Sequence, residues 1–243
     1  MSDAAGVELG RARDAIRPLL SLTDPGDALT VYYALYHSPA LTRLHVHRDA
    51  LGSADGFVAT CTTGADLFRP LVVARAEREE VLRALLRQSL TAGRPYRFSL
   101  PLRYVPVVED VVRVSEVHVG TVLVLDPSAF QPVLNVLVTQ GEATAGGGLR
   151  FEIRSQGRVV AAAGTNWRSP HFGEIYVYTE PQGRGRGWGK SVASACTEAL
   201  LAQGVRPLYV VAEGDEVSLG LAASLGYRDT GHREWIAAGA REG

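Results

Sequence analysis

The chain has 243 residues, 46% of them hydrophobic, and a formal net charge of −1. This size allows one large or two small globular domains, and the balanced charge gives no reason to expect nucleic acid or an anionic membrane as a partner. The longest apolar stretch, 117–127, is too short to span a bilayer, and no signal-peptide pattern opens the chain. Cys61 and Cys196 lie among apolar neighbours, which is typical of core residues in a reduced, cytoplasmic protein.

One order of elements is predicted twice along the chain. In the first half, periodicity and turn residues indicate a helix at 25–36, a hairpin of 43–49 with 56–61, a strand at 67–73, a helix at 77–90 and a strand at 96–100. In the second half, they indicate a hairpin of 149–155 with 158–167, a strand at 174–179, a helix at 188–203, a strand at 207–212, a helix at 216–225 and a final hairpin at 227–237.

The nearly constant offset between equivalent elements favours two copies of one α/β unit over two generic α/β halves. We place the boundary near 101–110 and predict domains at 1–108 and 109–243.

Between the strand at 174–179 and the following helix, residues 182–191 read QGRGRGWGKS. A P-loop would need glycine at Arg184, and a dinucleotide-binding fingerprint would need it at Trp188. The pattern that fits is R-x-x-G-x-G, where small residues let an anion approach the amides and positive end of a helix. The alternative is a tight turn with solvated arginines.

The same turn in the first copy carries Glu77, Glu79 and Glu80. Carboxylates suit the start of a helix but would repel a phosphate. We therefore predict that the second copy binds an anion and that the first is a scaffold.

Arg184-Gly185-Arg186-Gly187-Trp188-Gly189, followed at the right interval by Leu225-Gly226-Tyr227, resembles the GNAT superfamily of acyl-CoA-dependent N-acyltransferases over roughly residues 110–238. The order of the two halves is similar to that of glycine N-acyltransferases and mycothiol synthase. The resemblance implies tandem GNAT-like units, each a mixed, mostly antiparallel sheet flanked by helices, with a degenerate first copy at 1–108 and an acyl-CoA-binding second copy at 109–243.

The resemblance also implies acetyl-CoA or another acyl-CoA as cosubstrate, without a metal. The loop would hold the pyrophosphate, and a strand that splays from its neighbour would hydrogen-bond the pantetheine. The cofactor-binding residues expected on this basis are Val177, Tyr178, Thr179, Arg184, Gly185, Arg186, Gly187, Trp188, Gly189, Lys190 and Ser218.

Acyl transfer to an amine needs a base that makes the amine neutral. The family often places a carboxylate before the loop, where Glu174 lies, although a solvated residue at a strand start is an equal alternative. Tyr178, on the same face by alternation, is a second catalytic candidate, with packing as its alternative role. Many family members have a tyrosine acid where this chain has Ala222, and Asp215 replaces the usual asparagine at the helix start. A thiolate can leave without a dedicated acid, so we assign none.

Other candidate residues carry less chemistry. His45 and His47 could be half of a metal site, but no third ligand follows at suitable spacing. His171 and His232 could line an acceptor pocket or simply lie at the surface. The acceptor pocket would be formed by a helix in the region 127–138, the loop 140–148 and the hairpin 228–236, with the first half of the chain as a further candidate contributor.

The sequence predicts an N-acetyltransferase that transfers an acetyl or other acyl group from acyl-CoA to a primary amine of an unknown acceptor by direct attack. Its partners would be acyl-CoA and that acceptor, with no nucleic acid and no membrane. The main alternative is an inactive CoA-binding or regulatory module. A third reading, an aminoacyl transferase that uses charged tRNA, would need a basic channel that the balanced charge does not suggest.

Overall fold

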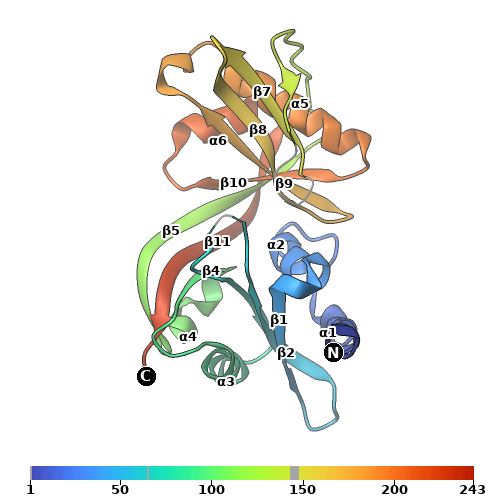
Figure 1. Cartoon of the computed structure of the whole chain (residues 1–243), viewed down its shortest axis with the longest axis vertical. Coiled ribbons are helices and arrows are strands. Elements are labelled where there is room, and N and C mark those ends of the chain that lie inside the picture. The colour runs from blue at the N-terminus through green and yellow to red at the C-terminus, as the bar shows by residue number, and fades with distance from the viewer. Residues whose placement is uncertain (1, 65, 143–147) are drawn as a thin grey trace. The chain divides into compact units, whose positions relative to one another are not determined.

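The computed structural model describes residues 2–64, 66–142 and 148–243. Its residues form two compact units (Figure 1). Unit 1 consists of Met1–Gly120 and Arg233–Gly243, and unit 2 of Thr121–His232. The chain passes from one unit to the other within β5 (Val112–Leu125) and returns within β11 (Tyr227–Arg241). The sequence places residues 233–243 in the second domain, whereas the structure groups them with unit 1.

Unit 1 contains the predicted elements of the first half, together with an N-terminal helix that the sequence analysis does not predict. Its elements before β5 are α1 (Ser2–Ile16), η1 (Arg17–Leu19), α2 (Ala28–Val31), η2 (Tyr32–Tyr36), η3 (Pro39–Leu41), β1 (Thr42–Arg48), β2 (Ala54–Cys61), β3 (Leu71–Ala76), α3 (Glu79–Ser89), β4 (Pro95–Pro101), η4 (Leu102–Tyr104) and α4 (Val105–Glu109). The predicted hairpin is confirmed, because β1 and β2 pair in antiparallel register. β3 starts later than predicted: the Asp66 carboxylate accepts hydrogen bonds from the Phe68 and Arg69 amides and holds the preceding residues in a turn.

The sheet of unit 1 has the strand order β1-β2-β3-β4-β11-β5 and helices on both faces. On one face, α3 buries Val81 and Leu85 so closely that a Cβ on Gly56 would lie 2.7 Å from Val81 Cγ1. On the other face, Asp27, just before α2, forms an ion pair with Arg75 of β3. The core beneath α3 is built from apolar residues of β2, β3, β4, α3 and α4.

In unit 1, a tyrosine side chain hydrogen-bonds to the main chain at the end of β3. β3 and β4 are parallel and pair only at Leu71 with Arg97 and at Val72 with Phe98. Beyond these pairs, the Tyr104 hydroxyl accepts a hydrogen bond from the Ala76 amide at 3.1 Å and donates one to the Ala76 carbonyl at 2.9 Å. One side chain thus satisfies both main-chain groups of the last residue of β3.

Unit 2 repeats this topology with a different set of side chains. Its elements between β5 and β11 are β6 (Thr139–Gln140), β7 (Arg150–Ser155), β8 (Arg158–Arg168), β9 (Phe172–Thr179), η5 (Pro181–Gly183), α5 (Trp188–Ala202), β10 (Arg206–Ala212) and α6 (Glu216–Ser224). The predicted hairpin of β7 with β8 is confirmed, and β10 runs parallel to β9. The strand order continues from β5 as β10-β9-β8-β7-β6. Helices α5 and α6 pack with apolar residues of these strands into one core.

Two predicted elements of unit 2 are wrong. Residues 227–237 do not form a hairpin but lie in the single strand β11, with Gly231 accommodated at φ +79°. Both parts of this strand bond to other strands: the Thr230 hydroxyl donates to the Val122 carbonyl, and Glu234–Ala240 pair with β4.

Residues 127–138 also form no helix. Pro132 lacks the amide that a helix interior requires, and the Val133 amide donates instead to the Ser194 hydroxyl of α5 at 2.8 Å. Residues 143–147 of the predicted loop 140–148 lie outside the described residues. None of the helices described combines the length and hydropathy needed to cross a membrane.

Both cysteines are free and buried, as the sequence predicts for core residues. Burial raises the pKa of Cys61 and of Cys196 to about 12. At neutral pH both remain protonated thiols, which are poor nucleophiles.

We expect Tyr104→Phe to destabilise the protein, because the Ala76 amide and carbonyl both lose their hydrogen bonds to the hydroxyl while the ring still fills the core. The expected loss in the free energy of unfolding is about 1–3 kcal/mol. Chemical denaturation measures it. The matched control is Tyr36→Phe, whose hydroxyl makes no hydrogen bond to any described residue. Equal stabilities of the two variants would contradict this role of Tyr104.

Candidate active site

Alternate residues of β9 point to opposite faces of the sheet of unit 2. Ile175 and Val177 pack into the core beneath α5. A Cβ on Gly189 in the first turn of α5 would contact both Thr179 and Val177, which confirms the direction of these side chains. Glu174 and Tyr176 therefore point to the face away from α5.

β9 and β10 separate halfway along β9. They pair at Phe172 with Arg206, at Gly173 with Pro207 and at Glu174 with Leu208, and the ladder ends there. Past Glu174, the edge of β9 that faces β10 has no ladder partner on that strand. Main-chain groups on such an edge can pair with an extended ligand as if it were another strand. The predicted pantetheine-binding residues Val177, Tyr178 and Thr179 all lie in this separated part.

The glycine-rich loop delivers the chain from β9 into α5. The N-cap residue Gly187 has φ +73° and provides no side-chain cap, and Gly185 has φ +76°. This left-handed conformation favours glycine. The first backbone bond back to the cap runs from the Ser191 amide to the Gly187 carbonyl at 3.0 Å. The amides of Trp188 and Gly189 therefore have no partner within the helix and can bind an anion.

Two other glycines allow the loop to pack tightly against β9. A Cβ on Gly189 would lie 2.7 Å from Thr179 Oγ1, and a Cβ on Gly183 would lie 3.0 Å from the Trp188 ring. The end of β9 and the first turn of α5 are thus in direct contact. Because of this contact, the separated edge of β9 leads directly to the amides of α5.

Positive charge surrounds the amides of α5. Arg184 and Arg186 are exposed, Lys190 is half-buried, and the Arg186 guanidinium lies over the Trp188 ring at 5.0 Å. An arginine stacked on an aromatic ring keeps its charge available near the loop.

Ser218 lies at the start of α6, where the Asp215 carboxylate accepts a hydrogen bond from its amide at 3.0 Å. Hydrogen bonds from the Ser218 amide and hydroxyl lower the pKa of Asp215, and the charge of Arg184 lowers it further. Ser218 therefore lies on α6, and the cap residue of this helix, Asp215, is close enough to Arg184 of the loop for their charges to interact.

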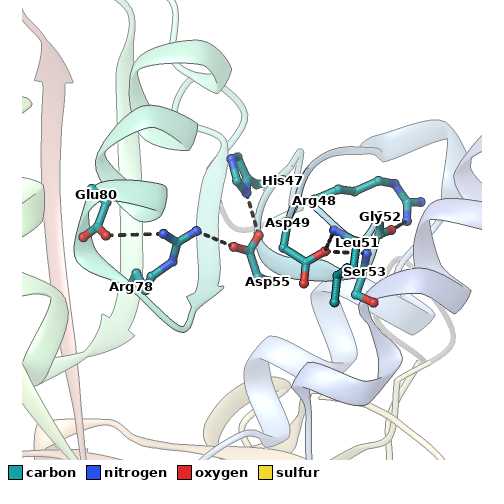
Figure 2. A network of polar contacts seen from close by, with 9 residues as sticks. All are labelled: His47, Arg48, Asp49, Leu51, Gly52, Ser53, Asp55, Arg78 and Glu80. Atoms are coloured by element: carbon teal, nitrogen blue, oxygen red, sulfur yellow. Dashed lines mark hydrogen bonds and ion pairs between the residues drawn. The ribbon is translucent and has the colours of Figure 1, made fainter.

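In unit 1, the corresponding helix start differs in charge and in contacts. Figure 2 shows Arg78, the N-cap residue of α3, between Asp55 and Glu80, with His47 also contacting Asp55. The Asp55 carboxylate accepts from Arg78 Nη2 at 2.9 Å and pairs with His47 Nδ1 at 2.5 Å. Burial opposes ionisation of Asp55, but these hydrogen bonds outweigh it and lower its pKa. Glu79 and Glu80 occupy the first turn, as the sequence predicts, whereas Glu77 lies before the N-cap residue Arg78.

Among the described residues, no third ligand joins His45 and His47 to complete the metal site that their spacing suggests. His47 is engaged by Asp55, and burial lowers the pKa of His45. Across the part of the chain that the structure describes, no group of three potential ligands is arranged to hold a metal.

Glu174 is a buried carboxylate at the point where β9 and β10 separate, and its residue is 9% exposed. Its Oε1 accepts from Asn166 Nδ2 at 2.6 Å and its Oε2 accepts from Trp167 Nε1 at 2.7 Å. Burial raises the pKa of Glu174, and these two hydrogen bonds offset only part of the shift. Each carboxylate oxygen retains a second lone pair, so the group can still accept a proton. A fixed carboxylate with a raised pKa has the properties of a general base.

The second catalytic candidate lies elsewhere on β9. Tyr178 is 51% exposed and four residues beyond Glu174, a distance of about 13 Å along a strand. The structure therefore does not bring Tyr178 and Glu174 together on one reacting atom. Tyr178 lies instead beside the loop, on the separated part of β9.

Ala222, at the position expected for a tyrosine acid, packs in the core of unit 2. Ala222 is 0% exposed and belongs to the core formed with α5. Tyr209 and Tyr227 in the same core have pKa values raised by burial, and the Tyr227 hydroxyl hydrogen-bonds to Thr197.

Neither predicted histidine joins Glu174 through a described contact. His171 lies in the turn before β9, where its carbonyl accepts from the Arg206 amide, and His232 is an exposed residue of β11.

A polar cluster on β7 is not among the sites predicted from the sequence. Arg150 and Glu152 lie on the same face of the sheet as Glu174, and Arg150 contacts Tyr176. The signal in the sequence is the alternation of RFEIR at 150–154, where charged residues take one face and Phe151 and Ile153 take the core.

Comparisons with known proteins agree with this architecture. The family model described as FR47-like protein, which is GNAT-like, matches residues 153–236. The sequence matches none of the curated proteins with which it was compared.

Solved structures give the fold over most of the chain. A GCN5-related N-acetyltransferase from Kribbella flavida has a TM-score of 0.59 and 18% identity, with 84% of this chain and 91% of that chain covered. A tandem GNAT protein from the clavulanic acid biosynthesis pathway has a TM-score of 0.58 and 14% identity, with coverage of 97% and 95%. A Drosophila protein has a TM-score of 0.65 and 13% identity, with 96% of both chains covered.

The chain therefore has the α/β fold of the GNAT superfamily, and the resemblance found in its sequence is confirmed. The similarity to a tandem GNAT protein extends over nearly the whole chain, which agrees with a two-unit arrangement.

We expect Gly189→Ala to destabilise the protein, because the added Cβ would collide with Thr179 Oγ1. The expected loss is about 1–3 kcal/mol in the free energy of unfolding. Gly220→Ala is the matched control: this glycine also lies in a helix, but an added Cβ there meets nothing within 4 Å. The control should be stabilised by about 1 kcal/mol, and denaturant titration of both variants measures the contrast. If the two substitutions changed stability alike, the tight contact between loop and strand would be disproved.

Proposed function

We propose that unit 2 binds acetyl-CoA or another acyl-CoA and transfers the acyl group to a primary amine. The observation that carries this proposal is the separation of β9 from β10 at Glu174, next to a helix start whose first amides have no partner within the helix. A long ligand with a diphosphate at one end and a hydrogen-bonding arm would fit this arrangement. Amides at the start of α5 would bind the diphosphate, and the free edge of β9 would bind the arm.

In the proposed reaction, Glu174 removes a proton from the acceptor ammonium, and the neutral nitrogen attacks the thioester carbonyl carbon. The C–N bond forms, the C–S bond breaks, and the CoA sulfur leaves with the bonding electrons. A second proton lost by nitrogen balances the proton that the thiolate takes up. The thiolate can leave unaided, because a thiol pKa of about 8.5 makes it a tolerable leaving group.

The alternative is a CoA-binding or regulatory module without turnover. It is favoured by Ala222, which is wholly buried where family members often have a tyrosine acid. Titration calorimetry with CoA tests what the two proposals share, and release of free thiol from acetyl-CoA with a panel of amines separates them. Absence of any CoA binding would overturn both.

We expect Glu174→Gln to lower kcat by about 10²- to 10⁴-fold, the usual contribution of a general base, while the Kd for CoA stays within twofold. The amide can still fill the site and accept one of the two hydrogen bonds. Glu198→Gln, on the exposed side of α5, is the matched control and should leave both values unchanged. Equal losses of kcat and of CoA affinity would show that Glu174 is structural and not a base.

The pH dependence should carry the signature of Glu174. Because burial raises its pKa, the carboxylate needed as base forms only above the usual carboxyl range, so kcat/KM should fall as pH drops through that raised value. Initial rates from acid to neutral pH measure this limb. In Glu174→Gln the limb should disappear, while the dependence on ionisation of the amine remains; a limb that persists unchanged would belong to another group.

A further inference from the structure

The face of the unit 2 sheet that presents Glu174 also carries a charged cluster on β7, which we define as Arg150, Glu152 and Arg154. Glu152 is 4% exposed. Its Oε2 accepts from Arg150 Nε at 3.1 Å and its Oε1 accepts from Arg154 Nε at 2.6 Å. Burial opposes the charge on Glu152, but these hydrogen bonds outweigh it and lower its pKa. Two guanidinium groups therefore share one ionised carboxylate, and the cluster retains one net positive charge.

The register of the sheet joins Arg150 to β9. Arg150 pairs with Gly164 on β8, and Gly164 pairs with Tyr176 on β9. Gly164 leaves the space between them open, because a Cβ there would lie 2.8 Å from Tyr176 Oη. Arg150 Nη1 reaches across this glycine and donates to Tyr176 Oη at 3.1 Å.

These contacts fix Arg150 without using all of its donors. A guanidinium has five N–H groups, and Nε and one N–H of Nη1 are engaged by Glu152 and Tyr176. The Arg150 side chain is 30% exposed, and its remaining donors make no hydrogen bond to any residue that the structure describes. A held, half-buried arginine with free donors is suited to bind a carboxylate with two parallel hydrogen bonds.

The cluster lies at a short distance from the proposed base. Tyr176 is two residues from Glu174 on the same face, a separation of about 7 Å, and β7 lies beyond β8 at about 4.8 Å per strand. An amine bound to Glu174 and a carboxylate bound to Arg150 would each take up about 3 Å of this span through their hydrogen bonds. The few ångströms that remain match a short molecule with an amine and a carboxylate a few bonds apart.

We propose that Arg150, held by Glu152 and Tyr176, binds the carboxylate of the acceptor, so that the acceptor is an amino acid or a similarly short amino carboxylate. This inference rests on the proposed function, because it is Glu174 as base that places the amine on this face. Arg150 acts here as a specificity determinant, and the proton transfer stays with Glu174.

The test uses matched pairs of α-amino acids and their own carboxamides, with the full-length protein and acetyl-CoA. Within the pairs that react, we expect the amino acid to have a KM about 10- to 100-fold below that of the amide, as a charge-assisted hydrogen bond to a carboxylate would give. Arg150→Gln should raise the KM for the amino acid by the same factor and leave kcat and the KM of the amide within twofold. Arg150→Lys, which keeps the charge without the planar fork, should fall between the two.

Arg154→Gln is the matched control. Arg154 also pairs with Glu152, but it lies farther along β7 and is not in register with Tyr176, as Arg150 is. It should change the preference less than Arg150→Gln does. Thermal unfolding and CoA affinity of every variant report whether the fold is intact.

A second readout needs no turnover: calorimetric titration of the same pairs into protein saturated with CoA. Tighter binding of the amino acids, lost in Arg150→Gln, supports the carboxylate site even if no acetyl transfer occurs, and that outcome would overturn only the proposed enzymatic function. Acetyl transfer with equal preference for acids and amides, unchanged in Arg150→Gln, would overturn this inference and leave the proposed function standing.

Discussion

The end of the hydrogen-bond ladder between β9 and β10 is the constraint on which the other features of unit 2 depend. Parallel strands that remain paired would leave no free main-chain edge, and the loop after β9 would be an ordinary turn. Because pairing stops at Glu174 and Leu208, the second half of β9 retains a free edge that leads directly to the amides of α5. The contact between Gly189 and Thr179 joins that edge to the helix start, and a side chain larger than hydrogen at 189 would push them apart. The glycines of this segment therefore serve two purposes, namely positive φ at 185 and 187 and close packing at 183 and 189.

The two units show how one topology can be open in one copy and closed in the other. Both contain an antiparallel hairpin, a third strand, a helix and a parallel strand that pairs with the third over a few residues only. In unit 1, Tyr104 satisfies the main-chain groups of Ala76 at the end of β3, and the first turn of α3 is acidic. The Tyr104 hydroxyl occupies the main-chain groups of β3 that a ligand would bind, and the carboxylates of the first turn would repel a phosphate. This recurrence supports the tandem interpretation, and the role of unit 1 as a scaffold stays a prediction.

The remaining chemistry of unit 2 lies on the sheet face away from α5. Glu174 is buried between the donors of Asn166 and Trp167, which fix its orientation while burial raises its pKa. The same face bears the cluster on β7, where Arg150 reaches Tyr176 across a glycine. A proton acceptor and a fixed cation thus lie on one rigid surface. Both are set by strand register, so their separation is defined by the sheet and not by a flexible loop.

The sequence alone determined the order of most elements in each half, the glycine-rich turn into a helix and the resemblance to GNAT proteins, because these depend on local periodicity, helix capping and short motifs. Two predictions from the sequence are wrong. Residues 127–138 form no helix, because Pro132 lacks an amide and the Val133 amide donates to the Ser194 hydroxyl of α5. Residues 227–237 form part of one strand and no hairpin, because they hydrogen-bond to β4 and to Val122. Only the tertiary structure decided that Glu174 is buried and held by hydrogen bonds, and that Tyr178 lies too far along β9 to act on the same atom as Glu174. It also decided that Arg150 hydrogen-bonds to Tyr176. These facts depend on register between strands distant in sequence and on the desolvation of particular side chains, and no local pattern in a single sequence encodes either.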